Sequence, residues 1–219
     1  MTEPSSTYWN HFYELRRPEI EEPSSFARVC RDRLRPDLRL FELGCGNGRD
    51  ALFFAAEGLR VTACDQSAVA IERLAGRGDL ERFAHRPQFV QADFAAMPGG
   101  YRGQMDVVYS RFSMHAVSAT VASAVLAWAF AGLRPGGQLL LEARSVAGSL
   151  YGKGLAVEGE ADAFIHDGHY RRFLRSESLT GELTRIGFQV RDLVEAAGLA
   201  IYKDDDPVVL RVFAEKPQQ

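Results

Sequence analysis

Apolar residues gather along this chain in short runs that alternate with segments of helical spacing. The short runs predict strands at residues 38–44, 59–65, 87–93, 105–110, 138–144, 189–195 and 207–216. Between them, apolar positions three and four residues apart predict helices at residues 49–58, 67–78, 117–133 and 176–188. Strands that alternate with helices indicate βαβ units. We therefore predict an α/β fold with a seven-stranded, Rossmann-like, mostly parallel sheet and helices on both faces.

Several boundaries carry local signals. Ser67 is a candidate N-cap, and Gly58 and Gly76 are candidate helix stops. The sequence "RPGG" at 134–137 predicts a turn before the fifth strand. The run at 207–216 alternates apolar and polar residues, which is typical of an antiparallel edge or hairpin strand. We therefore expect the sheet to close with an antiparallel strand.

Composition narrows the class of protein. The chain has 219 residues, of which 46% are hydrophobic and 25% charged, and this suits one globular domain. Its formal net charge is -3 and no basic block stands out, so we expect no nucleic-acid partner. Cys30, Cys45 and Cys64 lack CxxC spacing, which favours reduced thiols and no metal site. No apolar stretch approaches a membrane span and residues 1–23 lack a signal-peptide core, so we expect a cytoplasmic protein.

The stretch "FELGCGNGRD" at 41–50 places Gly44, Gly46 and Gly48 directly after the first predicted strand. Ligands of open parallel sheets bind beyond the carboxyl ends of the strands, where these glycines permit a tight turn and close backbone approach. The third glycine comes one residue too early for a dinucleotide-binding G-x-G-x-x-G motif, and no G-K-[ST] follows as a phosphate-binding loop requires. The pattern therefore indicates a small-molecule site of another kind.

The motif E-L-G-C-G-N-G resembles the first motif of class I S-adenosylmethionine (SAM)-dependent methyltransferases. Residues 43–74 are similar in particular to the tellurite-resistance-type branch, and the resemblance extends over 38–144, including "LRPGG" before the fifth strand. It implies SAM as the cofactor and S-adenosylhomocysteine (SAH) as its product. We expect one domain, 1–219, made of an N-terminal helical lid (1–36), a SAM-binding core (37–144), an acceptor-side insertion (145–175) and a closing helix and strands (176–219).

The resemblance also implies which residues hold the cofactor. Gly44, Cys45, Gly46 and Gly48 would pack against the methionine part of SAM, with Glu42 beneath it.

Further cofactor residues are expected at the ends of the next three strands. Asp65 ends the second strand, where a carboxylate can accept hydrogen bonds from both ribose hydroxyls, and Gln66 follows it. The resemblance implies that Asp93 meets the adenine amino group, that Phe94 lies against the ring, and that Ser110 contacts the cofactor.

Methyl transfer to a hydroxyl benefits from a base, so histidines near the fourth strand's end are of interest. His115, in "YSRFSMHAVS", is the first candidate base, because imidazole titrates near neutral pH. A helix-capping or surface histidine is the structural alternative. Arg111 in the same segment would bind an acceptor carboxylate or phosphate, or else pair with an acid at the sheet edge.

The segment "FIHDGHYRRF" at 164–173 breaks the strand–helix rhythm and is dense in polar side chains. His169 is a second candidate catalytic residue, while His166, Tyr170 and Arg171 are candidate acceptor contacts. His166 and His169 have the spacing of a metal pair on a helix, but Gly168 weakens a helix there. Acceptor binding is favoured over metal binding, with a plain surface loop as the alternative.

Aromatic residues at helical spacing open the chain: Tyr8, Trp9, Phe12 and Tyr13. We favour an amphipathic helix that docks on the core; as a lid over SAM, it would bring Tyr13 to the bound ligands. Near the other end, "YKDDDP" at 202–207 is expected to be a solvated acidic turn, or a contact for a cationic substrate or a second protomer.

These observations favour a SAM-dependent methyltransferase that acts on a small molecule, at a hydroxyl. One alternative keeps the enzyme class and takes a thiol, metalloid or halide acceptor, which needs little general base. Another is a SAM-binding partner protein without catalysis, and a third is a nicotinamide oxidoreductase. The chain is expected to be a monomer or a homodimer.

Overall fold

The computed structural model describes residues 5–15 and 22–218. Its strands form a seven-stranded sheet in the order β3-β2-β1-β4-β5-β10-β9. Their bounds are Gln88–Gln91 (β3), Arg60–Asp65 (β2), Arg39–Leu43 (β1), Met105–Arg111 (β4), Leu133–Arg144 (β5), Val209–Glu215 (β10) and Gln189–Ala196 (β9). The pairs β1–β2, β2–β3 and β4–β5 are parallel, whereas β10 runs antiparallel to both β5 and β9. The predicted α/β fold class is confirmed.

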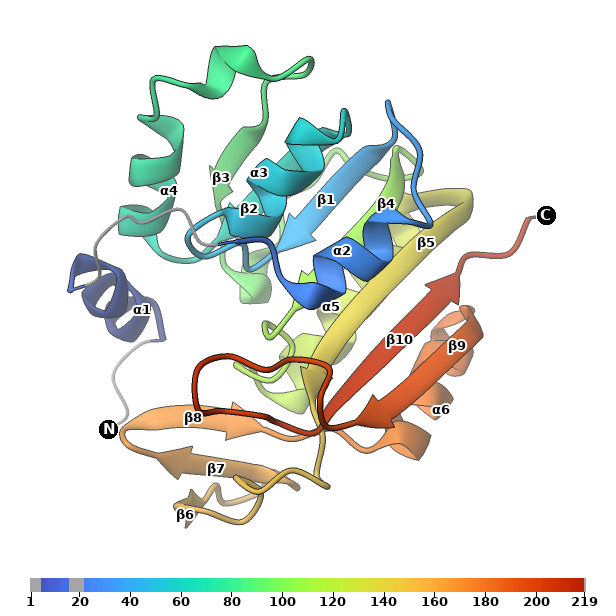
Figure 1. Ribbon diagram of the computed structural model, residues 1–219. Coiled ribbons are helices and arrows are strands. Elements are labelled where there is room, and N and C mark those ends of the chain that lie inside the picture. Colours follow the sequence, from blue (N-terminus) through green and yellow to red (C-terminus); the bar gives the residue numbers. More distant parts are fainter. Residues whose placement is uncertain (1–4, 16–21, 219) are drawn as a thin grey trace. The chain divides into compact units, whose positions relative to one another are not determined.

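The chain divides into two compact units, Met1–Pro98 and Gly99–Gln219. In the first unit, β1, β2 and β3 are accompanied by the helices α1 (Ser5–Glu14), α2 (Ser25–Arg31), α3 (Arg49–Ala56) and α4 (Ala68–Ala75) and the short 3-10 helices η1 (Leu80–Arg82) and η2 (Phe94–Ala96) (Figure 1). Ser67 caps α4 by accepting a hydrogen bond from the Ala70 N–H, and α4 ends at Gly76, both as predicted. The helix α4 packs on β3 and β2, and α1 packs on α4.

In the second unit, α5 (Ala119–Gly132) packs on β5, and α6 (Ser176–Ile186) packs on β9 and α5. Both helices lie behind the strands in the view of Figure 1. The strand β10 is buried along nearly its whole length because it lies between β5 and β9. Of the two alternatives for this strand, an edge strand or a hairpin strand, the structure shows a hairpin strand paired with β9, and β9 takes the edge.

The predicted turn at 134–137 is also wrong, because these residues remain within β5. The register of β4 against β5 jumps from Met105–Leu133 to Val107–Gln138, so the four residues form a bulge. Gly136 takes a left-handed φ of 76° there and donates its N–H to the Lys216 carbonyl at 2.8 Å. The hydrogen bond to Lys216, directly after β10, therefore holds this turn-like sequence within β5.

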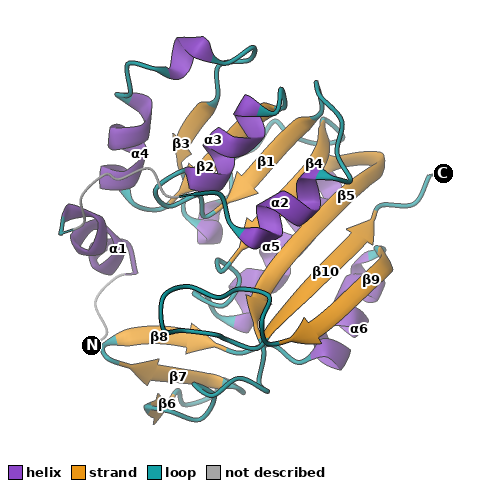
Figure 2. Cartoon of the chain, in the orientation of Figure 1, coloured by secondary structure: helices purple, strands orange, loops and turns teal. Residues whose placement is uncertain are grey.

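The predicted insertion at 145–175 contains a three-stranded antiparallel sheet, with strands β6 (Leu155–Ala156), β7 (Ala163–His166) and β8 (His169–Arg172) (Figure 2). Asp167 and Gly168 form the β7–β8 turn with φ of 52° and 71°. Asp-Gly is the preferred sequence for such a hairpin turn, because both central residues need positive φ. His166 and His169 therefore face each other across a hairpin, and a helical metal pair is excluded.

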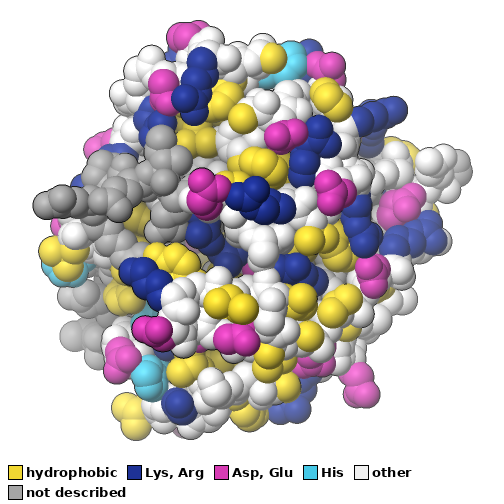
Figure 3. Space-filling view, viewed as in Figure 1, with side chains coloured by type: hydrophobic (Ala, Val, Ile, Leu, Met, Phe, Trp, Pro, Cys, Tyr) yellow, Lys and Arg dark blue, Asp and Glu magenta, His cyan; other side chains and the backbone are white. Residues whose placement is uncertain are grey.

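None of the helices within the described residues is long and apolar enough to cross a membrane. Basic and acidic side chains are interspersed on the face shown in Figure 3, in keeping with the absence of a basic block in the sequence. Cys30, Cys45 and Cys64 are buried free thiols, as expected.

Candidate cofactor and acceptor sites

The glycine loop joins β1 to α3 through three left-handed residues. Gly44, Gly46 and Gly48 have φ of 72°, 55° and 77°, a region that side chains with a Cβ rarely adopt. The N–H groups of Gly44 and Cys45 both donate to the Cys64 carbonyl at 2.9 Å, which fixes the loop to the end of β2. The loop therefore presents bare backbone at the carboxyl ends of β1 and β2.

Asp65, the last residue of β2, holds the loop from beside it. One carboxylate oxygen accepts the Gly46 N–H and the other accepts the Ser67 N–H, each at 2.9 Å. Burial raises the pKa of this carboxyl group, and the two N–H donors act in the opposite direction. Asp65 thus joins the glycine loop to the start of α4, a backbone role that the sequence did not reveal.

The remaining predicted cofactor residues of this unit lie on β1 and around the ends of β2 and β3. Glu42 is buried within β1 at 3% exposure. Gln66 is half-buried, and its carbonyl accepts a hydrogen bond from the Gln91 side chain at 3.4 Å. Asp93 is exposed and caps η2 by accepting the Ala95 N–H at 2.9 Å, and Phe94 is buried.

The helix α1 reaches the glycine loop through Tyr13. The Asn10 and Ser67 side chains are hydrogen-bonded at 2.8 Å, and Arg73 donates to the Tyr13 carbonyl. These two bonds join α1 to the N-cap and to the last turn of α4. The Tyr13 hydroxyl occupies the space that a Cβ on Gly46 would need. The predicted docking of an aromatic N-terminal helix is confirmed, and Tyr13 lies against the proposed cofactor loop.

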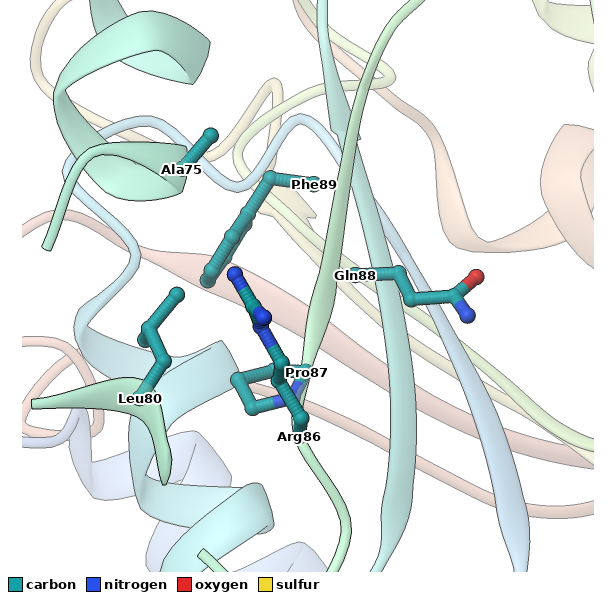
Figure 4. A pocket seen from close by; sticks show the side chains of 6 residues that line it. All are labelled: Ala75, Leu80, Arg86, Pro87, Gln88 and Phe89. Carbon is teal, nitrogen blue, oxygen red and sulfur yellow. The ribbon is translucent and has the colours of Figure 1, made fainter. Parts of the chain in front are cut away.

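A pocket of about 360 Å³ lies at the amino-terminal start of β3 (Figure 4). Its lining residues are Ala75, Leu80, Arg86, Pro87, Gln88 and Phe89. This is the opposite end of β3 from Asp93, so the pocket is separate from the residues predicted to hold the cofactor.

In the second unit, Ser110 is fully buried in β4 and shares a 2.6 Å hydrogen bond with Ser113. His115 follows on the same segment at 6% exposure, and its ring lies 5.5 Å from that of Phe112. Burial lowers the pKa of His115 well below 6.5, and the charges of Arg144, His169, Arg171 and Arg111 lower it further. The structure therefore brings the two predicted catalytic histidines into one cationic environment.

His169 is also buried, and desolvation followed by the charge of Arg171 lowers its pKa to about 4. Its neighbours His166 and Arg171 approach each other at 3.5 Å between Nδ1 and Nη1. Tyr170 donates its hydroxyl to Glu160 at 2.7 Å. His166, His169 and Arg171 thus share one face of the β7–β8 hairpin, whereas Tyr170 lies on the opposite face, where it bonds Glu160.

Arg111 pairs with an acid, as its structural alternative stated, but in the interior and not at an edge. Its Nε lies 2.8 Å from Oε1 of Glu142, while Nε of Arg211 donates to Oε2 of the same carboxylate at 2.7 Å. Glu142 is fully buried.

Sequence reasoning missed Phe112, Arg144 and Glu142. Phe112 has a φ of 54°, a strained value for a residue other than glycine, and its ring lies against the guanidinium groups of Arg111 and Arg144. Glu142 and Arg144 stood in the sequence as polar residues within an otherwise apolar strand, a signal that could have marked them. No cluster of potential metal ligands occurs among the residues with described placement.

Residues 40–137 match the family model of a methyltransferase domain. A search of curated proteins finds no match.

Many solved structures share the fold. A SAM-dependent methyltransferase from Methanosarcina mazei superposes with a TM-score of 0.75 at 17% identity, over 87% of this chain and 98% of the other. The 1,6-didemethyltoxoflavin-N1-methyltransferase of Burkholderia thailandensis, solved with its substrate and SAH, gives 0.67 at 19% identity over 88% and 77%. The glycopeptide N-methyltransferase MtfA gives 0.67 at 23% identity over 90% and 97%.

The sheet order and the glycine loop after β1 define an α/β fold that this chain shares with solved SAM-dependent methyltransferases. Together with the methyltransferase-domain match at residues 40–137, the fold supports the predicted class I SAM-dependent methyltransferase superfamily and its cofactor SAM. The tellurite-resistance-type branch stays a prediction.

Proposed function

We propose that the protein binds SAM at the glycine loop and transfers its methyl group to a small-molecule acceptor, at an oxygen atom. The observation that carries the proposal is the hydrogen bond from the Gly46 N–H to the buried carboxylate of Asp65. This bond holds the loop in its left-handed form before any ligand arrives, so little ordering cost remains for binding.

The roles proposed for the cofactor residues follow the family motif. Glu42, Gly44, Cys45, Gly46 and Gly48 take the methionine part.

The adenosine part of SAM is assigned to residues at the ends of β2, β3 and β4. Asp65 and Gln66 take the ribose, since each carboxylate oxygen of Asp65 has capacity for a further hydrogen bond. Asp93 and Phe94 take the adenine, and Ser110 completes the set from β4. When bound, SAM supplies an electrophilic methyl group on sulfur.

His115 and His169 are proposed to receive the acceptor's proton. Their lowered pKa values keep both imidazoles neutral at pH 7, as a base requires, but also make them weak bases. They therefore suit an acceptor hydroxyl that is itself acidic. Tyr13, Arg111, His166, Tyr170 and Arg171 are the proposed acceptor contacts.

A nitrogen acceptor is the second candidate, because two of the solved structures with this fold are named as N-methyltransferases. Transfer to an amine or a thiolate requires less from a base than transfer to a hydroxyl. The small-molecule acceptor itself is supported by the same two names, one a toxoflavin precursor enzyme and the other a glycopeptide enzyme.

Cofactor binding is tested by calorimetric titration with SAM, SAH and NAD. We expect SAM and SAH to bind and NAD not to. Asp65→Asn should weaken SAH binding by tenfold or more, on the order of 1.4 kcal/mol, whereas Asp79→Asn, at a half-buried site away from the glycine loop, should not. Binding of NAD alone would overturn the proposal.

Transfer is tested with SAM and a panel of phenols, amines and thiols, with SAH release as the readout and NMR to locate the new methyl group. We expect methylated phenols, with slower turnover in His115→Ala and His169→Ala. N- or S-methylated products would move the function to the corresponding alternative. Tight SAH binding without transfer to any acceptor would favour a non-catalytic partner protein.

A further inference from the structure

Two partly buried guanidinium groups in the second unit, those of Arg111 and Arg144, lie against the same Phe112 ring. The Arg111 side chain is 14% exposed and the Arg144 side chain 16%. Arg111 approaches Glu142 through Nε, and Arg144 donates through Nη2 to Asp205. Nε of Arg111 is buried and forms no hydrogen bond with any residue that the structure describes, although it lies 2.8 Å from Oε1 of Glu142. Buried donors of this kind are costly unless an acceptor reaches them.

His115 adds a further unsatisfied group beside them. Its Nδ1 is buried and forms no hydrogen bond with any residue that the structure describes. Phe112 connects the three groups, because its ring lies 4.3 Å from the guanidinium carbon of Arg111 and 5.4 Å from that of Arg144. The same ring contacts the His115 imidazole edge-on at 5.5 Å.

The backbone holds this arrangement in place. Phe112 adopts its left-handed conformation while its N–H donates to the Glu142 carbonyl at 2.9 Å, which fixes the end of β4 against β5. Strained residues of this kind persist where the surrounding structure requires them, and they occur frequently at functional sites. The positions of the two guanidinium groups are therefore set before a ligand binds.

We propose that the acceptor binds as an anion, with a negatively charged oxygen held by Arg111 and Arg144 beside Nδ1 of His115. This inference rests on the proposed function and names its substrate class: a carboxylate-bearing compound or an ionised phenol or enol. The guanidinium of Arg111 suits an oxyanion because its two terminal amino groups can donate two parallel hydrogen bonds, and Arg144 adds a second positive charge. His115 in its neutral Nδ1–H tautomer donates a further one.

The electrostatics of the cluster agree with this geometry. Arg144, Arg171 and Arg111 all disfavour a positive charge on His115, so the same field favours a negative charge placed there. Glu142 and Asp205 are the carboxylates paired with Arg111 and Arg144.

The test uses matched pairs of probes on the full chain, with and without SAH, measured by calorimetry or NMR titration. Benzoate against benzamide tests a carboxylate anchor, and 4-nitrophenolate against 4-nitroaniline tests an ionised hydroxyl. We expect the anion of at least one pair to bind about tenfold tighter than its neutral counterpart. Equal affinity within both pairs, or no binding of any probe, would overturn the inference.

Variants locate the effect. Arg144→Gln should remove the preference for the anion and leave the affinity for the neutral probe unchanged, and Arg144→Lys should restore part of it. Arg185→Gln, an exposed arginine on α6, is the matched control and should behave as the wild type. Arg144→Gln also removes the ion pair with Asp205 and with it some stability. His115→Phe is therefore a second variant, which should lower the affinity for the anion independently of that pair. Unchanged anion preference in both variants would contradict the assignment.

SAH affinity on the same samples separates the two proposals. If SAH binds and no probe pair shows anion preference, only the inference fails. If SAH does not bind, the proposed function fails, whatever the probes show.

Discussion

The carboxylate of Asp65 and the backbone N–H of Gly46 form a 2.9 Å hydrogen bond between residues 19 positions apart. The acid at the end of β2 thereby fixes the conformation of the loop after β1. The two features that sequence motifs treat as separate cofactor contacts are one hydrogen-bonded structure before the cofactor binds.

Replacing Gly46 with alanine should disrupt this structure. The substitution forces an L side chain into φ of 55° and towards the Tyr13 hydroxyl, so we expect a loss of about 1–2 kcal/mol in the free energy of unfolding. SAH affinity should fall by tenfold or more, measured by calorimetry. Gly103→Ala is the control, because Gly103 has φ of 63° with open space around it: stability should fall while SAH affinity stays the same. Equal SAH affinity in Gly46→Ala would contradict the role of the loop.

The contribution of the Ser67–Asn10 hydrogen bond to the contact between α1 and α4 can be measured by replacing two serine N-caps with alanine. Ser67 and Ser118 cap α4 and α5 in the same way, but only Ser67 also bonds Asn10 of α1. Each alanine variant should lose about 1 kcal/mol from the cap. Ser67→Ala should in addition speed limited proteolysis within residues 5–15, and Ser118→Ala should not. Identical cleavage rates would show that the Asn10 contact does not hold the helix.

The buried carboxylate of Glu142 should contribute strongly to the free energy of unfolding. It lies between Arg111 and Arg211, and Glu142→Gln leaves both guanidinium groups without their anion. Loss of one partner of a buried ion pair costs about 3–5 kcal/mol, to be measured by urea unfolding. Glu81→Gln, which removes an exposed ion pair with Arg86, should change little. A similar small effect for both variants would refute the importance of the buried cluster.

Stability should decline in acid because of the buried histidines. The pKa of His169 is about 4 in the folded protein against 6.5 for a free histidine, so the unfolded chain binds more protons between these values. The stability contribution is present above pH 6.5 and falls as the pH drops towards 4. The free energy of unfolding, measured with urea, should differ less between pH 7 and pH 5 in His169→Gln than in the wild type. The exposed His11→Gln should retain the full difference; His115 contributes with the same sign, so some dependence remains in every variant.

Local sequence signals determined most of the elements correctly. The seven strands followed from runs of apolar residues, and the ends of α4 followed from Ser67 and Gly76, because caps and stops act within one helical turn. The glycine loop followed from its motif, since glycine adopts positive φ without the steric cost that a Cβ brings. The Asp-Gly turn between β7 and β8 carried an equally local signal that was not used.

Tertiary structure decided the rest. The bulge at 134–137 depends on Lys216, some 80 residues away, so the residues "RPGG" alone cannot distinguish a strand from a turn. The neutral state of His115 depends on burial and on Arg144 and Arg171, which other strands bring to it. Sequence spacing holds no information on such encounters, because the desolvation and Coulomb energies that set them arise only when distant segments pack together.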